Sequence, residues 1–164
     1  MAQFVVLTMP VRSMKERGFT LVEIMIVVSI IALLAIMALP SFLRARQRSR
    51  DTKFINAMRV ATSAFETYAI EHAGAYPPDV GPGVLPAEMD TYFGPTLDWT
   101  AGTPIGGQWD WDYRVYAFKA GVSVLDPDAS FTEMSAIDKM FDDGSLSSGQ
   151  FQSIGATRYM DIIE

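Results

Sequence analysis

An uninterrupted apolar run near the N-terminus is the feature that most constrains this chain. Residues 24–39 read IMIVVSIIALLAIMAL, sixteen positions without a charged side chain, and the apolar stretch begins at Phe19 if Glu23 is included. About twenty such residues span the hydrocarbon core of a bilayer as a helix. A cleaved secretory signal has a shorter apolar core with small residues beyond it, whereas Pro40 to Arg44 follow here. The run therefore predicts a membrane-spanning helix.

Glu23 is the only charged side chain within this apolar stretch. A carboxylate at membrane depth costs a few kcal/mol even on permissive insertion scales, so it requires a partner or a function. Alternatively, the helix begins after Glu23 and leaves the carboxylate at the headgroup level, beside a favourable helix N-terminus. Taken alone, Glu23 leaves both interpretations open.

The residues around Glu23 form a specific motif. Residues 15–23 read KERGFTLVE and lead directly into the apolar run. This string closely resembles the N-terminal cleavage and methylation motif of type IV prepilins and type II secretion pseudopilins. In that family a membrane-embedded aspartyl peptidase cuts after the glycine and methylates the new N-terminal amine. The resemblance assigns Gly18 to cleavage, Phe19 to N-methylation and Glu23 to filament assembly.

The expected chemistry agrees with this assignment. Cleavage after Gly18 creates a cationic amine on Phe19, and a buried amine and a buried carboxylate each need an opposite charge. Glu23 lies about one helical turn from that amine, and in a packed filament it can also meet the amine of a neighbouring chain. We therefore expect Glu23 to fix the register between subunits.

The resemblance also divides the chain into segments. Residues 1–18 form a cleaved leader, residues 19–75 a long helix, and residues 76–164 a globular head. Residues 19–40 of the helix are expected to span the membrane or to form the filament core. Met14 would give a compact leader, so translation from Met1 or from Met14 stays open.

The orientation follows the family rather than the local charges. Arg12, Lys15 and Arg17 precede the apolar run, whereas residues 44–53 carry five basic side chains. A simple positive-inside count would place the C-terminal side in the cytoplasm. The resemblance implies the opposite, a single-pass protein of the bacterial inner membrane with its N-terminus cytoplasmic and its filament in the periplasm or at the cell surface.

A helical pattern continues beyond the apolar run. Apolar residues recur at spacings of three and four in a stripe that leads to His72, which we interpret as a stripe or surface residue rather than a ligand. The stripe contains Phe54, Met58, Ala61, Phe65 and Tyr68. Helix termination is expected near Gly74, and Pro40 predicts a kink or local unwinding within the helix.

The remainder of the chain differs in composition. Residues 1–75 hold 9 basic and 5 acidic side chains, whereas residues 76–164 hold 4 basic and 14 acidic ones. An acidic head argues against nucleic-acid binding there, because phosphate contacts need clustered Lys and Arg. Cysteine is absent, which excludes thiolate metal sites and slightly favours a pseudopilin over the many type IV pilins that carry a disulfide.

The head reads as a small antiparallel sheet. Residues 76–108 are rich in Gly and Pro and predict a loop with little regular structure. Alternation predicts a strand over residues 109–118, a turn at 119–121, a strand at 122–125 and a last strand at 159–163. Between the strands, Ser130 and Glu133 resemble a capping box before a short helix. The predicted fold is α+β, with a long N-terminal helix packed on this sheet.

Two features of the head have more than one interpretation. Trp109 and Trp111 share one side of the predicted strand, where they either pack in the core or form a sugar-stacking face; we favour the core. The acidic loops either hold calcium, which needs six to eight oxygen ligands, or are solvated turns. The candidate calcium ligands are Asp126, Asp128, Asp138, Asp142 and Asp143.

These observations predict a structural subunit rather than an enzyme. The chain has no Cys, one His and no phosphate-binding or nucleophile motif. Polymerisation into a type IV pilus-like or type II secretion pseudopilus filament is the predicted function. The expected partners are further copies of the chain, other pilins or pseudopilins, the prepilin peptidase, the inner-membrane assembly machinery and the membrane. The alternative is a single-pass, membrane-anchored periplasmic binding module that forms no filament.

Overall fold

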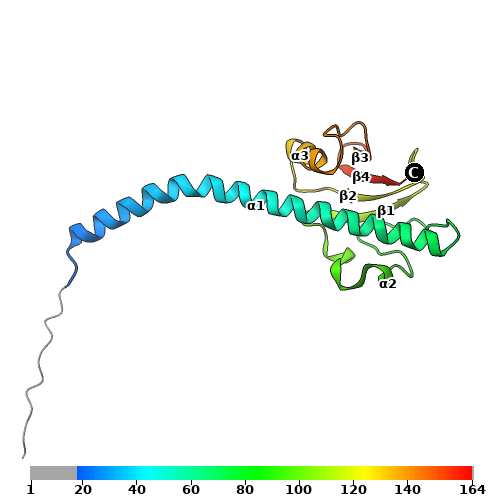
Figure 1. The fold of residues 1–164 in the computed structure, drawn as a ribbon, viewed down its shortest axis with the longest axis horizontal. Helices are drawn as coiled ribbons and strands as arrows, with labels where there is room; N and C mark the ends of the chain where they lie inside the picture. Colours follow the sequence, from blue (N-terminus) through cyan, green and yellow to red (C-terminus); the bar gives the residue numbers. More distant parts are fainter. Residues whose placement is uncertain (1–17, 164) are drawn as a thin grey trace, which may run out of the picture. The chain divides into compact units, whose positions relative to one another are not determined.

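The computed structural model describes residues 18–163 and divides the chain into two compact units, Met1–Phe42 and Leu43–Glu164 (Figure 1). A helix, α1 (Leu21–Glu71), contributes residues to both units. Of the predicted leader, only Gly18 belongs to the described residues. The predictions for residues 1–17, including both candidate start methionines and the basic residues Arg12, Lys15 and Arg17, lie outside the described part of the chain.

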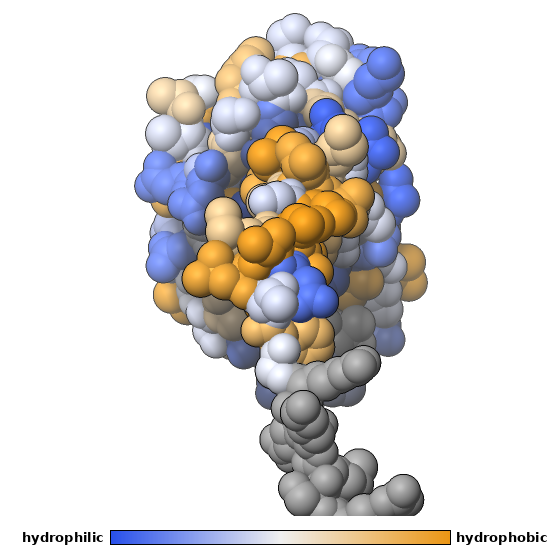
Figure 2. Space-filling view, turned by 90° about the vertical axis from the view of Figure 1, so that its left-hand side faces the viewer, coloured by the Kyte–Doolittle hydropathy of each residue, from blue (hydrophilic) through white to orange (hydrophobic). Residues whose placement is uncertain are grey.

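The first unit presents its apolar side chains outward. From Phe19 to Phe42, every large apolar side chain is at least half exposed, and Figure 2 shows an orange, apolar area on the face that it draws. α1 is the one helix among residues 18–163 that is long and apolar enough to cross a membrane. Pro40 lies inside α1 with helical residues on both sides, so the helix does not unwind there; a kink at Pro40 stays a prediction.

Both ends of α1 have a local cause. The helix begins at Leu21, two residues after the predicted start, because Thr20 caps it. It ends at Glu71, and the N–H of Gly74 then donates to the carbonyl of Ala69 at 2.7 Å. Gly74 has a φ of 86°, a left-handed conformation that suits glycine and closes the helix.

The second unit is a four-stranded antiparallel sheet packed on the C-terminal part of α1. Its strands are β1 (Gln108–Tyr113), β2 (Ala120–Leu125), β3 (Phe151–Ser153) and β4 (Arg158–Ile163). They are ordered β1-β2-β4-β3, and every neighbouring pair is antiparallel. The predicted α+β architecture, a long N-terminal helix with a small antiparallel sheet, is confirmed.

Aromatic stacking joins α1 to the sheet. The rings of Phe65 and Trp111 stack at 3.7 Å between centroids, and Phe54 stacks on Trp109 at 5.7 Å. Both tryptophans are fully buried, so their side of β1 is core rather than an exposed sugar-stacking face. The Trp111 indole also donates to the carbonyl of Pro77, which satisfies its one polar atom.

The predicted strand over residues 109–118 is too long at its C-terminal end. β1 stops at Tyr113 because Arg114 has a φ of 59°, a left-handed conformation that ends the extended chain. The predicted turn at residues 119–121 is also wrong. Ala120 and Gly121 belong to β2, where Ala120 is buried, and a Cβ on Gly121 would collide with Met160 of β4.

The predicted loop over residues 76–108 contains short helices and part of the core. It holds α2 (Asp90–Phe93) and two 3₁₀ turns, Gly94–Thr96 and Trp99–Ala101. Trp99 is 2% exposed and donates from its indole nitrogen to the carbonyl of Val84 at 2.9 Å. The segment is therefore irregular but packed, with Trp99 as its anchor.

The helix between β2 and β3 agrees with its prediction. α3 (Phe131–Phe141) begins after Ser130, whose hydroxyl accepts a hydrogen bond from the Glu133 N–H at 3.2 Å. Met134 and Ile137 are buried, as their spacing predicted. The short strand β3 was not predicted, although its Phe151 is fully buried against Phe54.

Candidate functional site

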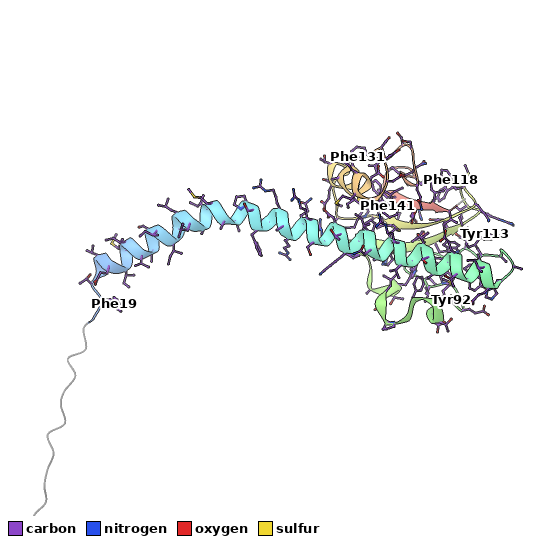
Figure 3. All side chains as sticks on the ribbon, in the orientation of Figure 1. Phe19, Tyr92, Tyr113, Phe118, Phe131 and Phe141 are labelled. Atoms are coloured by element: carbon purple, nitrogen blue, oxygen red, sulfur yellow. The ribbon has the colours of Figure 1, made fainter. Side chains whose placement is uncertain are left out.

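Thr20 and Glu23 form a reciprocal cap at the first turn of α1, beside Phe19 (Figure 3). The Thr20 N–H and hydroxyl donate to Oε2 of Glu23 at 2.8 and 2.7 Å, and the Glu23 N–H donates to the Thr20 hydroxyl at 3.2 Å. This is a capping box, in which two side chains satisfy N–H groups that a helix start leaves free. The T-x-x-E pattern at residues 20–23 is the signal that could have predicted it.

The cap leaves the adjoining peptide bond open. Among residues 18–163, no atom lies within 4 Å of the position that a Cβ on Gly18 would take, and Phe19 is 82% exposed. Both contacts from Thr20 go to Oε2 of Glu23, so within the described residues Oε1 accepts no hydrogen bond. The site thus combines an accessible Gly18-Phe19 junction with a carboxylate that has one oxygen available.

A second candidate site lies where α3 ends. Asp138, Asp142 and Asp143 each offer a carboxylate oxygen, and these oxygens lie within 4.8 Å of one another. Asp142 caps α3 by donating its N–H to the Asp138 carbonyl, and its Oδ2 accepts from the N–H of Gln150. Asp143 accepts from the Ser145 N–H at 2.7 Å, which fixes the loop around the cluster.

Asp138 is the unusual member of this cluster. Its side chain is fully buried, and neither of its carboxylate oxygens has a hydrogen-bond partner within the described residues. Burial raises the pKa of Asp138 to about 6, and the negative charges of Asp143 and Asp142 add to the increase. The backbone N–H of Gly144 lies close enough to oppose part of this increase, although its geometry is short of a full hydrogen bond. A buried carboxylate with so little donor support is the group that a cation would neutralise.

Gly149 closes the other side of the cluster. Its φ is 80°, and a Cβ built on it would collide with Oδ2 of Asp142 and lie 3.1 Å from Oδ2 of Asp143. The backbone at Gly149 therefore approaches the carboxylates more closely than any other residue type allows.

The other two predicted calcium ligands lie apart from this cluster. Asp126 is exposed at the end of β2, with a φ of 50°. The carboxylate of Asp128 lies against Gly106, where a Cβ would collide with it. The structure brings together Asp138, Asp142 and Asp143 but does not bring Asp126 and Asp128 into the group.

Comparison with known proteins bears on the first of these sites. Residues 13–39 match the family described as the prokaryotic N-terminal methylation motif. The chain carries a prepilin-type N-terminus. The matched span includes Gly18, Phe19 and the Thr20–Glu23 cap, and it ends just before Pro40.

Curated relatives share this prepilin-type segment. The chain is similar to prepilin peptidase-dependent protein D of Escherichia coli (strain K12), with 32% identity over 48% of this chain and 54% of the relative. For the type IV wide pilus major component PilA4 of Thermus thermophilus, identity is 41% over 34% of this chain and 43% of the relative. For the type IV major pilin protein PilA of Myxococcus xanthus, it is 37% over 35% of this chain and 26% of the relative.

The matches therefore cover about half or less of these relatives. No solved structure gives a significant match. Together the motif and the relatives support the type IV prepilin and pseudopilin family, whose named members here are pilus components, structural proteins rather than enzymes.

Sequence reasoning missed a buried charge cluster on the sheet face opposite α1. One nitrogen of Arg158 on β4, Nη1, donates to Asp110 at 2.6 Å and to Asp112 at 2.7 Å, and both carboxylates are buried. Ser123 on β2 donates to Asp112 at 2.6 Å. Burial raises the pKa of Asp110 to about 6, against the opposing effect of Arg158. The cluster ties β1, β2 and β4 together.

The alternation in β1 indicated that Asp110 and Asp112 share a face, but alternation alone does not reveal what covers that face. Here Tyr116, from the connection between β1 and β2, lies over the Arg158 guanidinium at 5.7 Å. Tyr116 lies within residues 109–118, which were predicted to form one continuous strand.

Proposed function

We propose that this chain is a structural subunit that polymerises into a type IV pilus-like or type II secretion pseudopilus filament after cleavage between Gly18 and Phe19. The prepilin-type match over residues 13–39 carries the proposal, because it includes Glu23 directly before the uncharged apolar run of residues 24–39. Exposed apolar side chains on residues 19–43 support it further, since such a surface needs lipid or protein around it.

The cap suggests how processing and assembly are linked. Hydrolysis of the Gly18-Phe19 peptide bond gives Gly18 a carboxylate and Phe19 a cationic amine, which the peptidase then methylates. Thr20 holds Glu23 through Oε2, so Oε1 is the oxygen left for an amine. In the membrane that amine belongs to the same chain, and in the filament it belongs to a neighbour. Each pairing neutralises two charges in an apolar environment.

The proposed setting follows from the same segment. Before assembly the chain lies in the bacterial inner membrane, crosses it once through α1, and keeps its N-terminus in the cytoplasm. The prepilin peptidase, the inner-membrane assembly machinery and other pilins or pseudopilins are its partners. The filament extends into the periplasm or from the cell surface.

The direct test is the mature N-terminus. Mass spectrometry of the protein purified from its membrane should give a chain that begins with methylated Phe19, and an intact Gly18-Phe19 bond would contradict the proposal. Glu23→Leu should then insert into the membrane and abolish filaments. Thr20→Val is the matched control, because it removes the hydroxyl contacts of the cap and keeps the carboxylate; its filaments should be fewer but present.

A monomeric, membrane-anchored binding module is the rival function. Such a protein uses α1 only as an anchor, so Glu23→Leu should leave its behaviour unchanged. Normal filaments with Glu23→Leu would contradict the pairing of carboxylate and amine, whereas the absence of any filament from the wild-type chain would favour the anchored module.

We also propose that Asp138, Asp142 and Asp143 hold a calcium ion that stabilises the loop after α3. The two unpartnered oxygens of the buried Asp138 are the specific observation in favour. Calcium takes six to eight oxygen ligands, so loop carbonyls or waters would complete the shell. Equilibrium dialysis of the full chain in detergent should give one calcium per chain, and none after Asp138→Asn.

A further inference from the structure

A charged contact joins α1 to α3 near the start of the second unit. Arg50 of α1 donates from its guanidinium to a carboxylate oxygen of Glu133 in the first turn of α3, and the Glu133 side chain is only 10% exposed. Asp51 follows Arg50 along α1 and is 4% exposed. It lies one helical turn before Phe54 and Ile55, so helical spacing places it on the buried stripe of α1. The contact therefore contains two carboxylates and one cation.

One negative charge in this contact has no partner. Arg50 neutralises Glu133, whereas Oδ1 of Asp51 is buried and accepts no hydrogen bond within residues 18–163. From α3 the charge that acts on Asp51 is that of Glu133, and from α1 it is that of Arg50. Burying an ionised carboxylate without its own cation is costly, and protonation removes that cost. Asp51 should therefore hold a proton at a pH where ordinary aspartates have lost it.

Glu133 provides an acceptor for this proton. Asp51 and Glu133 lie within hydrogen-bonding reach of one another, and two ionised carboxylates have no hydrogen with which to form such a bond. Burial raises the pKa of Asp51 to about 6, the charge and hydrogen bond of Glu133 add to the increase, and Arg50 opposes it. A protonated Asp51 can donate to Glu133 while Glu133 keeps its ion pair with Arg50.

We propose that Asp51 and Glu133 share one proton, and that this proton controls how firmly α3 docks on α1. With the proton in place, the bridge holds the first turn of α3 on the long helix. Loss of the proton leaves two negative charges beside one cation in a buried contact, so the carboxylates repel and α3 loosens. The inference concerns the head alone and does not depend on filament formation.

The size of the effect follows from the titration of Asp51 in two states. While α3 is docked the pKa of Asp51 is about 6, and when α3 detaches it returns toward the ordinary value of 3.8. A raised pKa favours the docked state at low pH, and this advantage is lost as the pH rises through about 6. Docking should therefore be about tenfold more favourable at pH 5 than at pH 7.5.

Hydrogen exchange of the full chain in detergent measures this docking, with calcium chelated. Asp138 also lies in α3 and titrates in the same range, so the wild type is compared with Asp51→Asn, which keeps Asp138. The quantity is the protection of the α3 amides at pH 5 relative to pH 7.5, after correction for intrinsic exchange rates. This ratio should be about tenfold larger in the wild type than in Asp51→Asn. Equal ratios in the two chains would overturn the proposal.

Carbon-13 NMR of the side-chain carboxyl groups tests the shared proton itself. In the wild type the signals of Asp51 and Glu133 should both show a step near pH 6, because coupled groups titrate as a pair. Glu133→Gln removes one negative charge and frees Arg50 for Asp51, so the Asp51 midpoint should fall toward its ordinary value. A midpoint that stays near pH 6 in this variant would show that burial alone retains the proton, and an ordinary midpoint in the wild type would show that no proton is retained. Either result overturns the proposal.

Discussion

The buried carboxylate of Asp138 allows a quantitative test of the proposed calcium site. A pKa that rises from 3.8 to about 6 on folding corresponds to about 3 kcal/mol, at about 1.4 kcal/mol per pKa unit. Below pH 4 the group is protonated in both the folded and unfolded chain, so this cost is absent. As the pH rises from 4 to 6, the unfolded chain ionises first, and the stability falls until the full cost is present above pH 6.

Asp138→Asn removes that charge. Without calcium at pH 7.5, the variant should therefore be more stable than the wild type by up to about 3 kcal/mol, and at pH 4 by no more than about 0.5 kcal/mol. For a head of this size, 1 kcal/mol corresponds to about 4 °C in melting temperature, so the difference is up to about 12 °C.

Calcium should remove most of this difference. A ligand at one hundred times its dissociation constant stabilises the folded state by about 2.7 kcal/mol. The melting temperature of the wild type should rise by about 10 °C with calcium, and that of Asp138→Asn should not change. The size of the difference between the two melting temperatures thus depends on the metal.

The measurement is near-ultraviolet circular dichroism of the full chain in detergent, with and without calcium, at pH 4 and 7.5. All three tryptophans, Trp99, Trp109 and Trp111, are buried in the head, so the signal reports its tertiary packing rather than the membrane helix. Asp126→Asn is the matched control, because it removes a charge outside the cluster and should leave the calcium response intact.

Three results would refute this reasoning. A calcium response in Asp138→Asn equal to that of the wild type would show that the ion binds elsewhere or only to exposed groups. Equal stability of the two chains without calcium at pH 7.5 would show that burial of Asp138 carries no cost. Loss of the calcium response in Asp126→Asn would place the site at the end of β2 instead.

Three further predictions concern the head. Arg158→Leu should lower the free energy of unfolding by about 3–5 kcal/mol in a denaturant titration, because it leaves Asp110 and Asp112 buried without a cation; a loss below about 1 kcal/mol would contradict this. Phe65→Ala should cost about 3–5 kcal/mol in the same titration through the cavity beside Trp111, whereas an exposed substitution such as Ile70→Ala should change little. Gly149→Ala should reduce the calcium-induced rise in melting temperature, since its methyl group would collide with the aspartates; an unchanged rise would exclude Gly149 from the site.

The elements with strong periodicity were predictable. The charge-free run and the stripe through Phe54 and Phe65 predicted α1, and the alternation at Trp109 and Trp111 predicted β1 and its buried face. In each case several residues repeat the same local signal, so a single unusual position does not obscure it. The prepilin-type motif was similarly identifiable, because its residues are contiguous.

Features that depend on distant residues were not predictable. Trp99 lies in a Gly- and Pro-rich segment without periodicity, and its burial depends on rings from distant elements, Phe65 of α1 at 5.6 Å and Trp109 of β1 at 5.8 Å. Asp110 and Asp112 are buried because Arg158, more than forty residues away along the chain, reaches them. Nothing near either aspartate in the sequence indicates that partner.

Other features were available in the sequence and were overlooked. Asp138 follows Met134 by four residues and Ile137 by one, so helical spacing already places it on the buried side of α3. Asp138 therefore differs from the loop aspartates Asp142 and Asp143, because it lies within α3. Thr20 and Glu23 repeat the spacing that identified Ser130 and Glu133, and this spacing predicts the cap that the structure contains.

The stacking of Phe65 on Trp111 has a mechanical consequence for a subunit that is pulled along α1. A load on this helix passes into the sheet sideways, through rings that lie face to face at 3.7 Å. To separate helix from sheet, the rings must slide past one another together with the Phe54 and Trp109 pair, so both contacts resist at once. The two ring pairs between α1 and β1 therefore carry the tension. The irregular segment that connects α1 to β1 along the chain carries little of it.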